Sequence, residues 1–368
     1  MHPGRFPSVL LALCALPAVA FGDEWVGKKV MPAKWGVAGN ATEQKNEIPA
    51  SWLIGVVRRV EGDKLLVRVV SSEAWMKKEE VVTLEQAVPY FTNLLKSNPN
   101  DELARCKRGW ASAEKGELDE AIKDFDELIR SAPETSEWFN LRGRVYALKG
   151  ELDKAIQDYS EANRLEPDNA GIYSNRAFAY SAKKDFDKAI HDFDEAIRLL
   201  PEQPALYANR ALAYIAKKDF DKALTDCNEA IRLGPTFPAA YGNRGVVHYN
   251  RKEYAKAIND YKQAVQLAPN EAEFRYPLAW YLATCPDHKL RDGKKAVEHA
   301  RRACELTRWK VAIYVSTLAA AYAEAGDFEQ AVNWQKKALE NPSYSKACGD
   351  AGRRMLELFE KKNAYRDQ

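Results

Sequence analysis

A fifteen-residue pattern recurs every 34 residues through the middle of this chain, and this period restricts the folds available to it. The pattern reads DKAIQDYSEANRLEP at 153–167, DKAIHDFDEAIRLLP at 187–201, DKALTDCNEAIRLGP at 221–235 and AKAINDYKQAVQLAP at 255–269. DEAIKDFDELIRSAP at 119–133 extends the series towards the N-terminus by the same step. Self-similarity at a fixed period of about 20–50 residues is typical of repeat arrays in which each unit stacks on the next.

Each unit has the pattern of two helices that pack closely together. Apolar residues recur at helical spacing in both halves of the unit. A proline then ends the second helix, because it lacks an N–H group and clashes with the preceding turn. Small residues at one position of each helix allow close approach; they are Gly109, Gly143, Ala177, Ala211, Gly245 and Ala279 on the first helix and Ala121, Ala155, Ala189, Ala223 and Ala257 on the second.

This pattern resembles the tetratricopeptide repeat over residues 83–343. Half a repeat opens the array and about seven repeats follow, of which the sixth is irregular because it carries about five extra residues around 286–292. Residues 344–368 are predicted to form a capping helix and a tail, of the kind that repeat arrays need at their ends. The resemblance implies a mainly α fold, a tetratricopeptide-repeat α-solenoid wound as a right-handed superhelix, preceded by a small β-barrel.

Residues 1–22 have the features of a secretory signal peptide. Arg5 precedes an apolar stretch at 9–21, and Ala18-Val19-Ala20 has the small-x-small form that signal peptidases cleave. The stretch is shorter than the roughly 20 residues that span a bilayer, and an uncleaved anchor is the alternative. We therefore expect an exported chain, periplasmic or secreted, without an integral membrane segment after the signal is removed.

Residues 23–82 are predicted to form a separate small β-domain. Runs of β-branched residues at 52–57 and 65–70 flank the hairpin signal EGDK at 61–64. Their order resembles a bacterial Src-homology-3-like domain, with Trp75 in the place of the late tryptophan of such domains. The resemblance implies a barrel that binds peptides or cell-wall glycan. The alternative is a domain that only packs against the first repeat and covers it.

The composition argues against several classes of function. The chain carries 55 basic and 53 acidic residues, a formal net charge of +2, so no large field of one sign attracts nucleic acid. It contains no glycine-rich phosphate loop, no nucleophile elbow and no helical His-Glu-x-x-His motif. We therefore predict that the protein is not an enzyme and has no catalytic residue, metal or cofactor.

Three asparagines, Asn175, Asn209 and Asn243, recur one repeat apart on the predicted first helices. The resemblance places first helices on the concave face of the array, so these side chains would form a ladder along a groove. An amide offers both a donor and an acceptor, and it can pair with the backbone of an extended peptide of any sequence. They are the candidate peptide-binding residues, and the alternative is that they brace neighbouring helices.

Charged residues of opposite sign recur with the same period and are predicted to pair between adjacent helices. A guanidinium group is planar and carries five N–H donors, which suits a partly buried pair with a carboxylate. The predicted structural ion pairs involve Arg142, Arg176, Arg210, Arg244, Asp158, Asp192, Asp226 and Asp260.

Five cysteines follow the signal, and Cys285 and Cys304 flank the extra residues of the sixth repeat. We predict a disulfide between this pair, because disulfides persist in exported proteins; two buried free thiols are the alternative. A zinc site that adds His288 and His299 is a third hypothesis, although the spacing of the four residues matches no common zinc pattern.

The sequence thus predicts a non-enzymatic scaffold outside the cytoplasm that holds a protein or an extended peptide in the concave groove of its repeats. In the alternative, an envelope-structural or cell-wall-associated protein, the β-domain binds and the repeats act as a spacer. A third hypothesis is an accessory subunit that works beside a catalytic partner.

Overall fold

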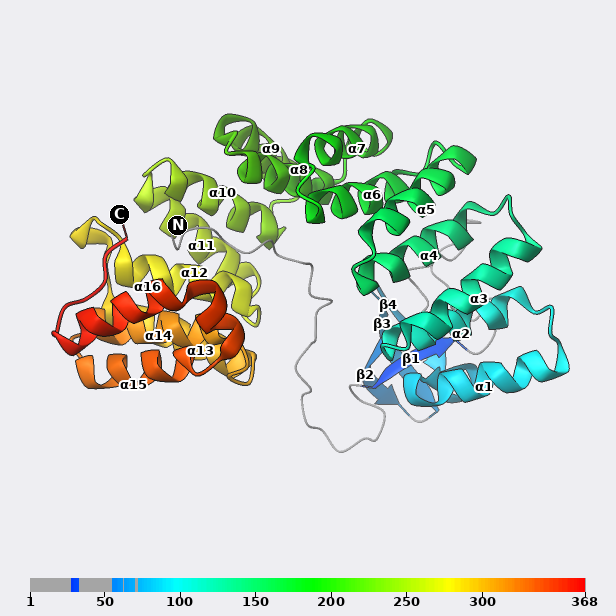
Figure 1. Ribbon diagram of the computed structural model, residues 1–368, viewed down its shortest axis with the longest axis horizontal. Helices are drawn as coiled ribbons and strands as arrows, with labels where there is room; N and C mark the ends of the chain where they lie inside the picture. Colours follow the sequence, from blue (N-terminus) through cyan, green and yellow to red (C-terminus); the bar gives the residue numbers. More distant parts are fainter. Residues whose placement is uncertain (1–27, 33–54, 62, 70–71, 368) are drawn as a thin grey trace. The chain divides into compact units, whose positions relative to one another are not determined.

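The computed structural model describes residues 28–32, 55–61, 63–69 and 72–367 (Figure 1). These residues form a small antiparallel sheet followed by sixteen α-helices. The signal predicted at 1–22 lies outside the described residues. The chain divides into two compact units, whose described parts we call the N-terminal unit (28–185) and the C-terminal unit (186–367).

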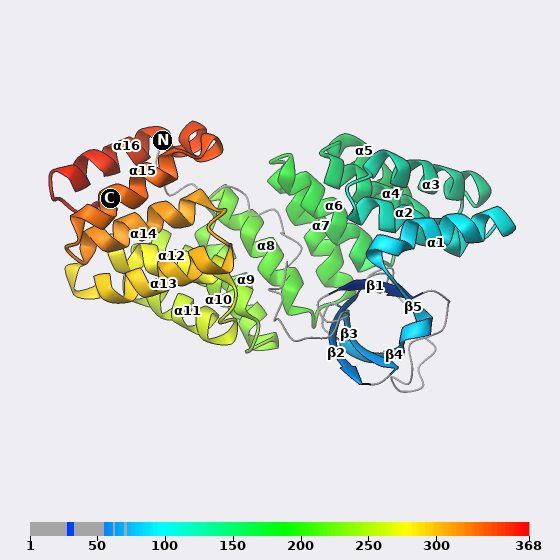
Figure 2. The same ribbon diagram turned by 90° about the horizontal axis from the view of Figure 1, so that it is seen from below.

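Five short strands make up the sheet in the spatial order β4-β3-β2-β1-β5, and all neighbouring strands are antiparallel. They are β1 (Lys29–Pro32), β2 (Gly55–Glu61), β3 (Lys64–Val69), β4 (Ser72–Lys77) and β5 (Val81–Thr83), with a 3-10 turn, η2, at Lys78–Glu80. Figure 2 shows that the sheet is strongly curved. Within the described residues β4 and β5 remain its two edges, so the predicted closure into a barrel is not observed there.

Helix pairs follow the sheet in a regular order. The helices are α1 (Leu84–Ser97), α2 (Glu102–Glu114), α3 (Leu118–Ser131), α4 (Ser136–Lys149), α5 (Leu152–Leu165), α6 (Ala170–Ala182), α7 (Phe186–Leu199), α8 (Pro204–Lys217), α9 (Phe220–Leu233), α10 (Pro238–Asn250), α11 (Tyr254–Leu267), α12 (Ala272–Thr284), α13 (Gly293–Leu306), α14 (Ala312–Glu324), α15 (Phe328–Leu339) and α16 (Pro342–Glu360). Even-numbered helices from α2 to α14 are the first helices of repeats, and odd-numbered helices from α3 to α15 are the second helices. The fold is a mainly helical solenoid, in which the extra residues of the sixth repeat form a 3-10 turn, η3 (His288–Leu290).

The sheet packs against the first repeats of the N-terminal unit. Met31 of β1 and Val82 of β5 are buried in one hydrophobic cluster with Phe91 of α1 and Trp110 of α2. Lys29 Nζ also lies 2.8 Å from the carboxylate of Glu114 on α2. Met31 and Val82 therefore join the core of the first helices, whereas the sheet also has a separate hydrophobic cluster of its own that includes Val57, Leu65 and Val67.

The two helices of a repeat approach closely because small residues lie where they cross. Ala121, Ala155, Ala189, Ala223 and Ala257 on the second helices are all 0% exposed. At Gly245 of α10, a Cβ atom would lie 2.7 Å from the ring of Tyr261 on α11, so a larger residue requires a shift of the ring. One repeat earlier the corresponding residues are Ala211 and Cys227, a larger residue facing a smaller one.

Most first helices end in the same turn, which places one residue in the left-handed backbone region. In α8 the N–H of Lys218 donates to the carbonyl of Ile215 and the N–H of Asp219 to that of Tyr214, the two bonds of a Schellman motif. Glycine occupies the left-handed position at 116, 150 and 326, and lysine occupies it at 184, 218 and 252. Lys218 has a φ of 63°, at which the Cβ atom of an L-residue crowds the following carbonyl oxygen.

We expect Lys218→Gly to raise the free energy of unfolding by about 0.5–1 kcal/mol, because glycine adopts positive φ without this crowding. Lys218→Ala is the matched control, since it removes the same side chain but keeps the Cβ atom. Chemical denaturation of both variants measures the difference. Equal stability of the glycine and alanine variants would contradict a cost from the left-handed conformation.

Helix α16 closes the C-terminal unit through buried hydrogen bonds as well as apolar contacts. The hydroxyl of Tyr344 on α16 donates to Ser316 Oγ on α14 at 2.7 Å, and Ser316 donates to Gln335 Oε1 on α15 at 2.9 Å. Gln335 Nε2 then donates to the carbonyl of Gly352 on α16 at 3.0 Å. This chain of bonds satisfies a glutamine that is 0% exposed, and it ties three helices together.

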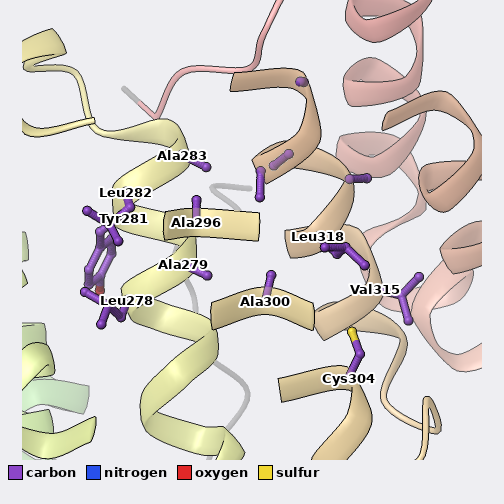
Figure 3. Packing of buried hydrophobic residues seen from close by; sticks show 14 of the residues in the cluster. Leu278, Ala279, Tyr281, Leu282, Ala283, Ala296, Ala300, Cys304, Val315 and Leu318 are labelled. Carbon is purple, nitrogen blue, oxygen red and sulfur yellow. The ribbon is translucent and has the colours of Figure 1, made fainter. Parts of the chain in front are cut away.

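The disulfide predicted between Cys285 and Cys304 is not formed, because both residues are buried free thiols. Cys285 follows the last residue of α12, where the chain turns towards α13. Cys304 lies eleven residues beyond the start of α13, or about 16 Å along the helix axis. A disulfide requires Cα atoms within about 7 Å. Figure 3 shows Cys304 at the opposite end of the hydrophobic cluster from Ala283, the residue two before Cys285.

We expect the denatured, unreduced chain to show the five described cysteines as free thiols. Burial raises the pKa of Cys304 to about 12 and also raises the pKa of Cys106, Cys227 and Cys285. These groups stay protonated and react slowly in the native chain, whereas Cys348 is only partly buried. Titration with a disulfide reagent counts the accessible thiols in the native chain and all free thiols in the denatured chain. If the denatured, unreduced chain shows two thiols fewer than expected, a disulfide is present and this prediction is wrong.

Candidate functional site

Arginines on the first helices link two successive second helices. Arg142 of α4 donates from Nε and Nη2 to the carboxylate of Asp158 on α5, at 2.9 and 2.7 Å. Its Nη1 donates to Asp126 on α3, in the preceding repeat, at 2.6 Å. The hydrogen bonds that Arg142 donates to Asp158 raise the pKa of Arg142, so the guanidinium stays charged. One side chain therefore joins three helices.

The other predicted ion-pair residues lie at equivalent positions. Arg210 donates to Asp226 and Asp194, Arg244 donates to Asp260 and Asn228, and Arg108 donates to Asp124 at the start of the series. Arg176 donates to Ser160 at 3.1 Å, and Asp192 lies buried on α7. Burial raises the pKa of the carboxylates of Asp158 and Asp226, and the arginine hydrogen bonds oppose this effect. These groups are occupied in packing the repeats.

We expect Asp158→Asn to lower the free energy of unfolding by about 3 kcal/mol, because it leaves the guanidinium of Arg142 without its buried partner. Asp126→Asn removes the other partner of the same arginine and should cost less than about 1 kcal/mol, since exposed ion pairs contribute little. Asp158 is 5% exposed, whereas the side chain of Asp126 is 40% exposed. Chemical denaturation compares the two variants. Equal losses would contradict the difference in burial as the cause.

The asparagines proposed as a peptide-binding ladder lie half-buried on first helices, and two of them contact the preceding first helix. Asn175 Nδ2 of α6 donates to Asn140 Oδ1 of α4 at 2.9 Å. Asn243 Nδ2 of α10 donates to the carbonyl of Ala208 on α8, also at 2.9 Å. Asn209 occupies the equivalent position of α8. Each bond uses one of the two N–H groups of an amide and braces adjacent repeats.

The first helices of the C-terminal unit carry apolar side chains that recur one repeat apart. Leu212 of α8 is 40% exposed, and Val246 of α10 and Trp280 of α12 follow it at steps of 34 residues, both partly buried. Ile215 and Tyr249 form a second, parallel series. Because these positions repeat with the array, they lie along one side of successive first helices.

An extended C-terminal tail, residues 363–367, lies across three of these first helices. It leaves α16, runs past α14 and α12, and ends near α10 (Figure 1, red). Oδ2 of Asp367 accepts hydrogen bonds from the hydroxyl of Tyr249 on α10 at 2.5 Å and from Nε1 of Trp280 on α12 at 3.3 Å. The backbone N–H of Asp367 donates to the carbonyl of Thr284 at 3.0 Å.

The two preceding tail residues also make specific contacts. Arg366 Nη2 lies 2.6 Å from the carboxylate of Glu324 on α14, whose other oxygen accepts from Arg291 at 2.9 Å. The ring of Tyr365 lies 5.7 Å from that of Trp280, centroid to centroid. We call Tyr249, Trp280, Thr284 and Glu324 the tail site. Burial and the bond to Asp367 raise the pKa of Tyr249, so its hydroxyl stays a donor well above neutral pH.

The sequence did not reveal the tail site. Its residues differ in type from their equivalents in other repeats, with Trp280 at the position of Leu212 and Tyr249 at that of Ile215. The tail itself lies outside the periodic region. The one available signal is the presence of larger aromatic groups on the first helices towards the C-terminal end of the array.

The other candidate sites in the described residues offer fewer groups that are available to bind a ligand. A depression between α1, α2 and α3 is lined by Arg105 and Arg108, but these cations are paired with Glu127 and Asp124. In the part of the chain that the structure describes, no group of three or more histidine, cysteine or acidic residues is placed to hold a metal ion. Among the described helices none has the length and apolarity to cross a membrane.

Comparison with protein families identifies the repeat. Family models described as tetratricopeptide repeat or TPR repeat match residues 84–134, 143–184, 170–203, 204–237, 238–271 and 311–340. No curated protein matches the chain.

Solved structures share the fold at low sequence identity. A chain of yeast Tom70 is 18% identical with a TM-score of 0.58, covering 76% of this chain and 59% of its own. A chain of the APC/C hetero-tetramer Cut9–Hcn1 is 17% identical with a TM-score of 0.56, covering 74% and 52%. A tetratricopeptide repeat protein from Parabacteroides merdae is 18% identical with a TM-score of 0.50, covering 70% and 98%. This chain thus spans between half and three-fifths of the first two.

Proposed function

We propose that this chain, which belongs to the tetratricopeptide-repeat family, is a non-enzymatic scaffold that holds a partner protein or peptide along the first helices of its repeats. The tetratricopeptide fold supports a protein-binding role, because its stacked helix pairs leave one long surface free. Each partly buried arginine and each buried carboxylate described above is occupied in packing the repeats. Leu212, which is 40% exposed, and the partly buried Val246 one repeat later are not used in this packing and can contact a ligand.

A single observation carries this proposal: an extended segment already lies across α10, α12 and α14. The tail contacts these helices through main-chain and side-chain groups, as the hydrogen bonds of Asp367 illustrate. A segment of another protein can use the same kinds of contact on α8 and α10. We therefore place the binding face on the first helices of the C-terminal unit.

The three asparagines take a different part in this proposal from the one the sequence predicted. Asn175 and Asn243 brace first helices through one N–H group each. The remaining donor and the oxygen of an amide can contact a ligand as well. We propose bracing as their main role and ligand contact as a secondary one for Asn209 and Asn243.

We also propose that the chain is exported to the periplasm or the medium, because residues 1–22 have the features of a secretory signal peptide.

A second candidate function places ligand binding on the sheet, as its resemblance to Src-homology-3-like domains suggests. Trp75 favours it, because this large aromatic residue on β4 is 38% exposed. In that case Trp75→Ala abolishes retention of the chain on peptidoglycan.

Site-specific photocrosslinking in the source cells tests the main proposal. A benzophenone amino acid replaces Leu212 on the first helix α8, or Arg232 on the second helix α9 of the same repeat. Both positions are exposed, with 40% for Leu212 and 64% for the side chain of Arg232. We expect a discrete adduct with one partner from position 212 and none from position 232. Mass spectrometry identifies the partner.

Adducts from position 232 alone, or the same adducts from both positions, would place binding elsewhere. An Asn175/Asn209/Asn243→Ala variant tests the role of the three asparagines. Loss of stability with an unchanged adduct at position 212 indicates bracing alone, whereas loss of the adduct from a folded variant indicates ligand contact.

A further inference from the structure

The tail is directed onto the first helices by the way α16 ends. Lys362 has a φ of 55°, and its N–H donates to the carbonyl of Phe359 while the N–H of Asn363 donates to that of Leu358. These are the two bonds of a Schellman motif, which reverses the chain at the end of a helix. The residues that follow, 363–367, belong to no helix or strand, so their backbone N–H groups can bond to α12 and its neighbours.

Three consecutive side chains of the tail are recognised by three different kinds of contact. The ring of Tyr365 packs beside Trp280, and the guanidinium of Arg366 pairs with Glu324, whose side chain is only 14% exposed. The carboxylate of Asp367 accepts from both Tyr249 and Trp280. Trp280 thus contacts the first and third residues, and an aromatic, a basic and an acidic residue are each matched in order.

A purely structural role for the tail makes a different prediction. The carbonyls of Ala283 and Thr284 belong to the last turn of α12, where helices leave carbonyl groups without partners. Arg366 and the backbone of Asp367 satisfy them. Any extended segment could cap a helix in this way. Capping requires neither the hydroxyl of Tyr249 nor the carboxylate of Asp367, and these two groups face each other at 2.5 Å.

We propose that the tail site is a binding site for extended segments with an aromatic–basic–acidic triplet, and that the chain's own Tyr365-Arg366-Asp367 occupies it until such a segment of a partner protein competes. This inference rests on the proposed function and adds the ligand class and the control of access. The tail is tethered a few residues from its site, so its effective concentration is on the order of millimolar. A partner segment can bind only to chains whose tail is released. Its apparent Kd is therefore the Kd for an open site divided by the fraction of such chains.

The test uses the chain's own tail as the probe. A fluorescein-labelled peptide Asn-Ala-Tyr-Arg-Asp-Gln, the sequence of residues 363–368, is titrated with a chain that ends at Lys362 and with the full chain. We expect anisotropy to show binding to the shortened chain and at least ~10-fold weaker binding to the full chain. Tyr249→Phe in the shortened chain should weaken binding, because it removes only the hydroxyl that contacts Asp367. A peptide with the same residues in scrambled order should not bind.

A second variant keeps the chain at full length. Asp367→Asn removes the charge that Tyr249 and Trp280 contact, and it should increase binding of the labelled wild-type peptide towards that of the shortened chain. Absence of binding to a shortened chain with native circular dichroism would overturn the proposal, as would equal binding to the shortened and full chains. If neither Tyr249→Phe nor scrambling of the peptide sequence weakens binding, the tail only caps helix α12 and the proposed recognition is wrong.

The outcomes separate this inference from the proposed function. If the shortened chain does not bind the peptide but position 212 still gives a partner adduct, the tail site is wrong and the scaffold proposal stands. If the peptide binds the shortened chain but position 212 gives no adduct in either chain, the tail site stands and the partner is held elsewhere. An adduct at position 212 that increases in the shortened chain supports both.

Discussion

The distance between the two helices of each repeat is set by the small residues at their crossing, and the other contacts of the array depend on this distance. At Gly245 the ring of Tyr261 leaves no room for a Cβ atom, and the alanines of the second helices are fully buried. Because the helices lie so close, an arginine on a first helix reaches carboxylates on two second helices. Arg142 does this with three hydrogen bonds to Asp158 and Asp126. Each repeat is thus stabilised through its neighbours.

This arrangement divides the surface of a repeat into two kinds. The side where helices stack carries small residues, aromatic rings and ion pairs at a spacing that recurs from repeat to repeat, and changes there disturb the packing. The exposed side of the first helices is under no such constraint, so its residues differ from repeat to repeat. Leu212, Val246 and Trp280 occupy equivalent positions but offer a different size and hydrogen-bonding capacity at each step. Such differences allow one array to recognise a segment in a fixed register.

The tail makes contacts of this kind within the chain itself. Its three side chains meet an aromatic ring, a carboxylate and a pair of donors that come from three different helices. Each contact is modest when taken alone, and the register of the extended backbone makes them act together. A segment that is tethered to the array gains this site at low entropic cost, whereas a free partner must supply better contacts or a larger interface.

The sequence by itself determined the period, the helix pairs, the prolines that end the second helices and the arginine–aspartate pairing. These features depend on residues within one repeat or sixteen residues apart in adjacent helices, so the pattern repeats visibly. It did not determine which groups the asparagine amides contact, since bracing and ligand binding need the same chemistry. It failed for Cys285 and Cys304, because nearness in sequence hides the length of α13. Only the tertiary structure decided the tail site, because Asp367 meets Tyr249 and Trp280 across 118 and 87 residues, a separation that no local period encodes.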